Sequence, residues 1–143
     1  MSRIERFEDL KAWQAARQLT KEVYAASSKG PFARDFAFRD QIRRAAVSVM
    51  SNIAEGFESR TTKLFIDYLG RAKASAAEVR SQLYTAKDLE YIGGETFDRL
   101  SELTSSVARQ IRKFSQYLES KSNTFRVREP EFNPGDPEER YEI

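Results

Sequence analysis

Residues 97–118 read FDRLSELTSSVARQIRKFSQYL, and this stretch is the strongest indication of the fold class. Its apolar side chains recur at alternating steps of three and four residues, at Phe97, Leu100, Leu103, Val107, Ile111, Phe114 and Leu118. This spacing places them along one face of an α-helix, as in helix bundles and coiled coils. The stretch therefore predicts a long amphipathic helix over residues 97–119, with Thr96 as its N-cap.

Three further segments show helical spacing of apolar residues, over residues 7–28, 36–55 and 63–92. We expect glycine and proline to end them, at Gly30-Pro31, Gly56 and Gly93-Gly94. Asp35 is placed to cap the second segment, and Thr61 or Thr62 the third. No segment has a convincing strand pattern. Four helices of similar length with short connections predict an all-α, up-and-down antiparallel four-helix bundle.

The net charge of +2 conceals an uneven distribution. Residues 1–128 contain 23 Lys and Arg against 16 Asp and Glu, whereas residues 129–143 contain one Arg, six acids and three of the four prolines. We expect residues 1–120 to form the bundle and residues 121–143 an acidic, proline-containing, non-helical tail. The sequence leaves open whether this tail lies along the bundle or forms a disordered terminus.

The chain has 143 residues and contains neither Cys nor His. Disulfides, thiolate nucleophiles and zinc fingers need Cys, and catalytic triads, histidine bases and the usual di-iron sites need His. No apolar run approaches the ~20 residues of a membrane helix. We therefore expect a cytoplasmic protein with no enzymatic activity, no cofactor and no membrane partner.

The second predicted helix carries an unusual polar stripe. Arg44, Ser48, Ser51 and Glu55 follow one another at steps of four, three and four residues, with Asn52 beside them. These steps place them on one narrow helix face. The rest of the helix is apolar and rich in alanine, which is typical of a helix buried on most sides. We interpret the stripe as a polar network in a subunit interface; a surface stripe on a monomer is the alternative.

Basic residues also recur along helix faces. Lys73, Arg80 and Lys87 are spaced at seven-residue steps, which keeps them on one face. The full set of candidate RNA-binding residues is Arg39, Arg43, Lys73, Arg80, Lys87, Arg109, Arg112 and Lys113. Such stripes can follow a phosphate backbone, and Tyr84 and Tyr91 nearby can stack on unpaired bases. An ordinary solvated surface is the alternative explanation.

Residues 44–56 read RAAVSVMSNIAEG. This stretch resembles the signature of the 23S ribosomal RNA intervening-sequence proteins, which is close to R-A-A-x-S-[IV]-x-x-N-I-A-E-G. Residues 7–13 and 65–83 are similar to the opening helix and the third helix of that family. The resemblance covers residues 7–118 and adds Arg60 and Glu78 to the residues of interest. The family's usual glycine before the third-helix serine is Ala74 here.

The resemblance implies a four-helix bundle that assembles as a ring-like homopentamer. It also implies a relation to the accessory proteins of diversity-generating retroelements, which are thought to contact RNA and a reverse transcriptase. We therefore expect a non-catalytic ring-like oligomer that binds structured RNA through basic helix faces. The alternative is a scaffold for protein–protein interactions that binds no nucleic acid.

Overall fold

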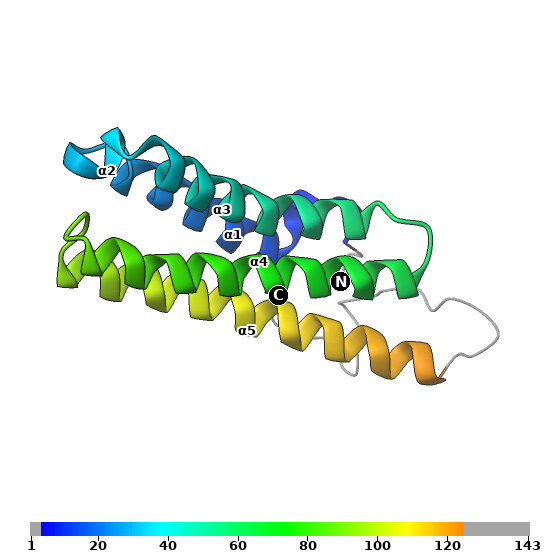
Figure 1. Cartoon of the computed structure of the whole chain (residues 1–143). Helices are drawn as coiled ribbons and strands as arrows, with labels where there is room; N and C mark the ends of the chain where they lie inside the picture. The colour runs from blue at the N-terminus through cyan, green and yellow to red at the C-terminus, as the bar shows by residue number, and fades with distance from the viewer. Residues whose placement is uncertain (1–3, 125–143) are drawn as a thin grey trace.

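The computed structural model describes residues 4–124 and consists of four long helices that pack side by side (Figure 1). They are α1 (Lys11–Ala26), α3 (Phe36–Phe57), α4 (Thr62–Asp88) and α5 (Gly94–Thr124), with a 3-10 turn at Phe7–Asp9 and a short helix α2 at Gly30–Arg34. Successive long helices run antiparallel. Helix α1 packs against α3 and α5, and α4 packs against the same two helices. The predicted up-and-down four-helix bundle is confirmed.

The apolar stripes identified in the sequence form the core. The seven apolar residues that recur at helical spacing along α4 are all buried: Phe65, Leu69, Ala72, Ala76, Val79, Leu83 and Ala86. On α5 the predicted stripe is buried as well, except that Leu103 is half-buried. The caps also agree, because Asp35 accepts from the backbone N–H of Phe38 at 3.3 Å and Thr61 accepts from that of Leu64 at 3.1 Å.

The expectation that Gly56 ends the second helix is wrong. Gly56 lies within the last turns of α3, where the helix meets α4 closely. A Cβ atom at this position would come within 2.8 Å of both Phe65 Cδ1 and Tyr68 Cβ. The glycine is therefore required by close helix packing rather than by a helix end.

Gly93-Gly94 likewise does not end α4, which stops at Asp88. The end is a Schellman motif, with Tyr91 N–H donating to Ala86 O at 2.8 Å and Glu90 N–H donating to Lys87 O at 3.0 Å. Glu90 takes the left-handed position, with φ 61°. Gly94 instead begins α5, so that Thr96 lies inside this helix and is not its N-cap.

The first predicted helix, over residues 7–28, is shorter than expected at both ends, because α1 spans only Lys11–Ala26. Leu10 has extended backbone (φ −74°, ψ 126°) and separates the 3-10 turn from α1. Gly30-Pro31 does not end α1 but begins α2, because proline fits the first turn of a helix.

The predicted start of the non-helical tail is too early. Helix α5 continues to Thr124, so residues 121–124 belong to the helix. The rest of the predicted tail, residues 125–143, lies outside the described residues.

Candidate nucleic-acid interface

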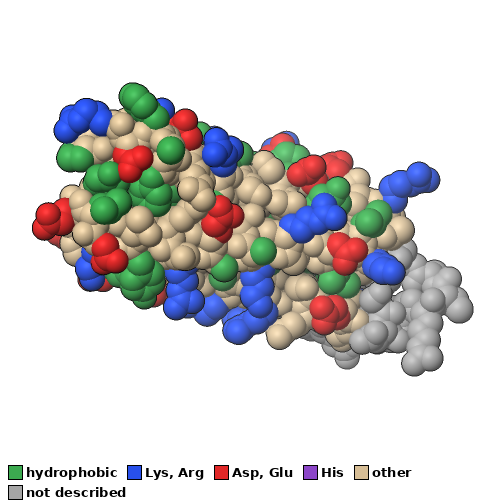
Figure 2. Space-filling view, in the orientation of Figure 1, with side chains coloured by type: hydrophobic (Ala, Val, Ile, Leu, Met, Phe, Trp, Pro, Cys, Tyr) green, Lys and Arg blue, Asp and Glu red, His purple; other side chains and the backbone are tan. Residues whose placement is uncertain are grey.

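A groove with basic walls runs between α4 and α5 and encloses about 400 Å³. It is lined by Lys73, Ala76, Ala77, Arg80, Thr104, Ser105, Ala108, Arg109 and Arg112, and we call it the basic groove. Figure 2 shows Lys and Arg side chains gathered along the lower middle of the molecule, where α4 and α5 adjoin. Four of the predicted RNA-binding residues thus meet in one place.

Small side chains make the surface hollow at this point. Ala76 and Thr104 are buried, and Thr104 donates its hydroxyl to Leu100 O at 2.6 Å. The longer side chains of Lys73, Arg80 and Arg112 are exposed around this floor. The small residues of α4 and α5 therefore form the floor of a shallow channel, and the cationic side chains form its sides.

The cations of the basic groove are largely uncompensated. Arg109 pairs with Glu102 at 3.1 Å, but the two side chains are 52% and 76% exposed, so water screens the pair. Among residues 4–124, the side chains of Lys73, Arg80 and Arg112 have no hydrogen-bond or ion-pair partner. No carboxylate of the described residues lines the basic groove. The site therefore presents positive charge that an anion can neutralise.

The positive surface continues around α5. A second groove, between α1 and α5, is lined by Lys11, Gln14, Ala15, Ser106, Arg109, Gln110 and Lys113. Arg109 lines both grooves and links them. Lys113, one of the predicted RNA-binding residues, lines this second groove. Lys11 was not a sequence candidate, because its position depends on how α1 packs against α5.

Lys87 extends the basic line of α4 beyond the basic groove. Its Nζ lies 4.5 Å from the centroid of the Phe97 ring, a cation–π contact. The side chain is exposed. Lys87 therefore stands next to the site rather than in it.

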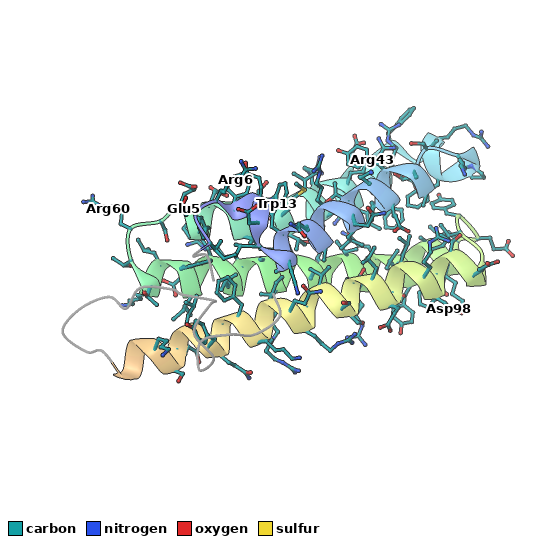
Figure 3. The ribbon with its side chains drawn as sticks, turned by 180° about the vertical axis from the view of Figure 1, so that it is seen from behind. Glu5, Arg6, Trp13, Arg43, Arg60 and Asp98 are labelled. Carbon is teal, nitrogen blue, oxygen red and sulfur yellow. The ribbon has the colours of Figure 1, made fainter. Side chains whose placement is uncertain are left out.

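Arg39 and Arg43 are not brought to the basic groove. Arg39 pairs with Asp40 at 2.9 Å and donates to Ala33 O at 3.0 Å. Arg43 donates to the hydroxyls of Ser27 and Ser28 and holds the end of α1. Figure 3 shows Arg43 on the side of the bundle formed by α3, away from α5. Both guanidinium groups therefore stabilise local contacts within the chain.

The predicted polar stripe lies where α3 meets α4. The hydroxyls of Ser48 and Ser75 are 2.8 Å apart, and Asn52 Nδ2 donates to Ser48 O at 2.8 Å and to Ser48 Oγ at 3.0 Å. Ser75 completes a network that joins the two helices.

The outer part of the stripe is open. Arg44, Ser51 and Glu55 are exposed in the single chain. On α4, Glu78 accepts from Gln82 Nε2 at 3.2 Å. Arg60 is exposed between α3 and α4, and it projects from the bundle (Figure 3).

The two tyrosines suggested for base stacking differ sharply. Tyr84 is 54% exposed and lies one helical turn beyond Arg80 on α4. Tyr91 is half-buried and donates its phenol to Asp35 Oδ2 at 2.7 Å. This hydrogen bond stabilises the protonated phenol and raises the pKa of Tyr91 above its ordinary value.

Residues 4–124 hold no group of three or more acidic side chains placed to bind a metal ion. Over the same residues, none of the helices combines the length and the apolar character needed to cross a membrane.

Comparisons with known proteins agree with this architecture. The family model described as 23S rRNA-intervening sequence protein matches residues 8–113. A crystal structure of a protein with unknown function from the S23 ribosomal protein family of Bacteroides thetaiotaomicron has a similar fold, with a TM-score of 0.68. The two sequences are 18% identical, and the similarity covers 73% of this chain and 98% of that one. No protein with a curated description matches the chain.

Proposed function

The chain belongs to the family of 23S rRNA-intervening sequence proteins, and on this premise we propose that it is a non-catalytic oligomer that binds structured RNA through the basic groove. The observation that carries the proposal is the arrangement of Lys73, Arg80, Arg109 and Arg112 around a channel that no carboxylate of residues 4–124 lines. Each cation that meets a phosphate releases condensed counterions, which favours binding.

The spacing of the cations suits a chain of phosphates better than a single small anion. Lys73 and Arg80 stand two helical turns apart on α4, about 10 Å along its axis. Lys11 and Lys113 extend the charge around α5 through the second groove. A polyanion that crosses this surface meets several cations in succession, whereas a single phosphate meets one or two.

The exposed part of the polar stripe supports an oligomer. Arg44, Ser51 and Glu55 are aligned on α3, and Val47 beside them is 38% exposed. A second copy of the chain packed here would bury Val47 and provide partners for the exposed polar side chains of the stripe.

The proposed contact lies at the junction of α3 and α4, on a different face from the basic groove between α4 and α5. In a ring of five subunits, as the family resemblance implies, the groove recurs five times. Linked sites of this kind bind far more tightly than one groove alone.

The test is binding of a labelled ribosomal RNA fragment, measured by fluorescence anisotropy over a salt series. Each occupied groove should contribute a slope of about −3 to log K against log salt, because four cations meet phosphates. Charge reversal at Lys73, Arg80 and Arg112 should abolish binding and leave the oligomer intact. The matched control reverses three exposed cations outside the groove: Lys29, Arg34 and Lys63.

A scaffold for another protein is the second candidate function. It is favoured by large apolar side chains that stay exposed, since Phe36 is 63% and Leu89 50% exposed. RNA that fails to bind even at low salt, together with a protein partner recovered after nuclease treatment, would support the scaffold instead.

A further inference from the structure

Tyr84 continues the cationic line of α4 with an aromatic ring. It follows Arg80 by four residues and precedes Lys87 by three, so the three side chains share one helix face. Its side chain is 54% exposed. Within the described part of the chain its hydroxyl has no hydrogen-bond partner. A ligand that leaves the basic groove along α4 therefore meets this ring next.

The ring of Tyr84 packs against a buried aromatic side chain. Phe97, which is 7% exposed, contacts it edge-on, with ring centroids 5.0 Å apart and an interplanar angle of 65°. Lys87 packs over the same Phe97 ring. A side chain held in this way loses little conformational freedom when it binds a partner.

Tyr91 cannot serve the same purpose. Its ring stacks on Phe32 with centroids 5.2 Å apart, and Phe38 packs beside both. Its hydroxyl is already bound to Asp35. Of the two tyrosines near the basic line, the structure leaves Tyr84 available.

An exposed aromatic ring next to phosphate-binding cations distinguishes between forms of RNA. A duplex keeps its bases stacked inside and presents backbone to the protein, so the ring contributes little to its binding. A single strand offers the faces of unpaired bases, and any base can stack on an aromatic side chain.

We propose that the RNA segment in the basic groove is single-stranded, and that one of its bases stacks on Tyr84. This inference rests on the RNA binding proposed above and identifies which part of a structured RNA occupies the site: an unpaired loop or end. Lys73, Arg80, Arg109 and Arg112 hold the phosphates, and Tyr84 selects the unpaired strand.

The experiment compares two RNA probes on the full-length chain. One is a labelled single strand of about 12 nucleotides, within the usual range of site sizes, and the other is a duplex of the same length and sequence. Tyr84→Leu should weaken single-strand binding about 5- to 150-fold, the loss expected for one stacked base. It should leave duplex binding unchanged.

Two controls separate stacking from general damage. Tyr84→Phe keeps the ring and should bind like the wild type. Tyr24→Leu removes a tyrosine of comparable exposure, 41%, from α1. No residue of α1 lines the basic groove, so this variant should also have no effect. Tyr84→Gln serves as a second variant if the leucine variant folds poorly.

A strand that contains 2-aminopurine reports stacking directly. Its fluorescence should be quenched by the wild type and by Tyr84→Phe, but not by Tyr84→Leu. Two results would overturn the role of Tyr84 but not the proposed RNA binding. One is equal affinity of wild type and Tyr84→Leu for the single strand, and the other is duplex binding as tight as single-strand binding. Failure of the wild type to bind either probe at low salt would overturn the proposed RNA binding itself.

Discussion

Tyr91 donates a hydrogen bond of 2.7 Å to the carboxylate of Asp35, a residue 56 positions earlier in the chain. The same carboxylate accepts from the backbone of Phe38 and so caps α3. One acidic side chain thus joins the start of α3 to the turn between α4 and α5. The stacked rings of Phe32 and Tyr91 close this end of the bundle.

Removal of the Tyr91 hydroxyl should lower stability without change of fold. Tyr91→Phe keeps the stacking on Phe32 but loses the hydrogen bond to a charged acceptor, so we expect a melting temperature a few degrees lower. Thermal unfolding followed by circular dichroism at pH 7 checks this. A melting temperature equal to that of the wild type would show that the bond contributes nothing.

The same bond predicts a dependence on alkaline pH. The pKa of Tyr91 is raised in the folded state, because the neutral phenol donates to Asp35. The stabilisation is therefore complete below the ordinary tyrosine pKa of about 10 and is lost as the pH rises through the folded value. The difference in stability between wild type and Tyr91→Phe should shrink above about pH 10. A difference that stays constant would contradict the assignment.

Gly56 and Gly70 should respond to alanine in opposite ways. Gly56→Ala forces a Cβ against Phe65 and Tyr68, so we expect a loss of about 1–3 kcal/mol from overpacking. Gly70 lies inside α4, and a Cβ added there would meet no atom within 4 Å, so Gly70→Ala should gain about 0.5–1 kcal/mol. Urea unfolding of the two variants measures both values. A stable Gly56→Ala variant would mean that α3 and α4 approach less closely.

Charge on the exposed face of α3 should dissociate the proposed oligomer. Val47→Glu combined with Ser51→Glu places two carboxylates in the proposed subunit contact, where burial without a partner is costly. Light scattering after size-exclusion chromatography should show a monomer. Gln116→Glu on α5, a helix outside that contact, is the control and should keep the wild-type mass. A double variant that retains this mass would place the interface elsewhere.

Removal of residues 125–143 should strengthen RNA binding at low salt. Residues 125–143 carry six acids against three Arg, a net charge of −3, and we expect this charge to compete with phosphate for the cations of the basic groove. Anisotropy measurements on the truncated chain test this, and the effect should fade at high salt. A full-length chain with the six acids changed to their amides keeps the three Arg of this segment, so it should bind at least as tightly as the truncated one. Weaker or unchanged binding after truncation would refute the competition.

Helix identity was predictable because burial imposes a period on the sequence. A residue that faces the core must be apolar, and along a helix every third or fourth side chain points toward the core. Phe65, Leu69 and Leu83 are buried as this rule requires. Glycine is ambiguous by comparison, since it serves both to end helices and to admit a close neighbour. Gly56 has the second role, which depends on Phe65 and Tyr68 from another helix.

The four helices, their apolar faces, the family and the acidic C-terminal segment could be predicted from the amino-acid sequence, because each depends on residues that are close in the chain. Which cations meet depends instead on how the helices pack. Lys73 and Arg112 line one groove because α4 and α5 pack antiparallel in a particular register, whereas Arg43 is held at the end of α1. The same packing leaves Tyr84 exposed and Tyr91 bound to Asp35. A helix period specifies the face on which a side chain lies, but the neighbouring helix determines what that face contacts.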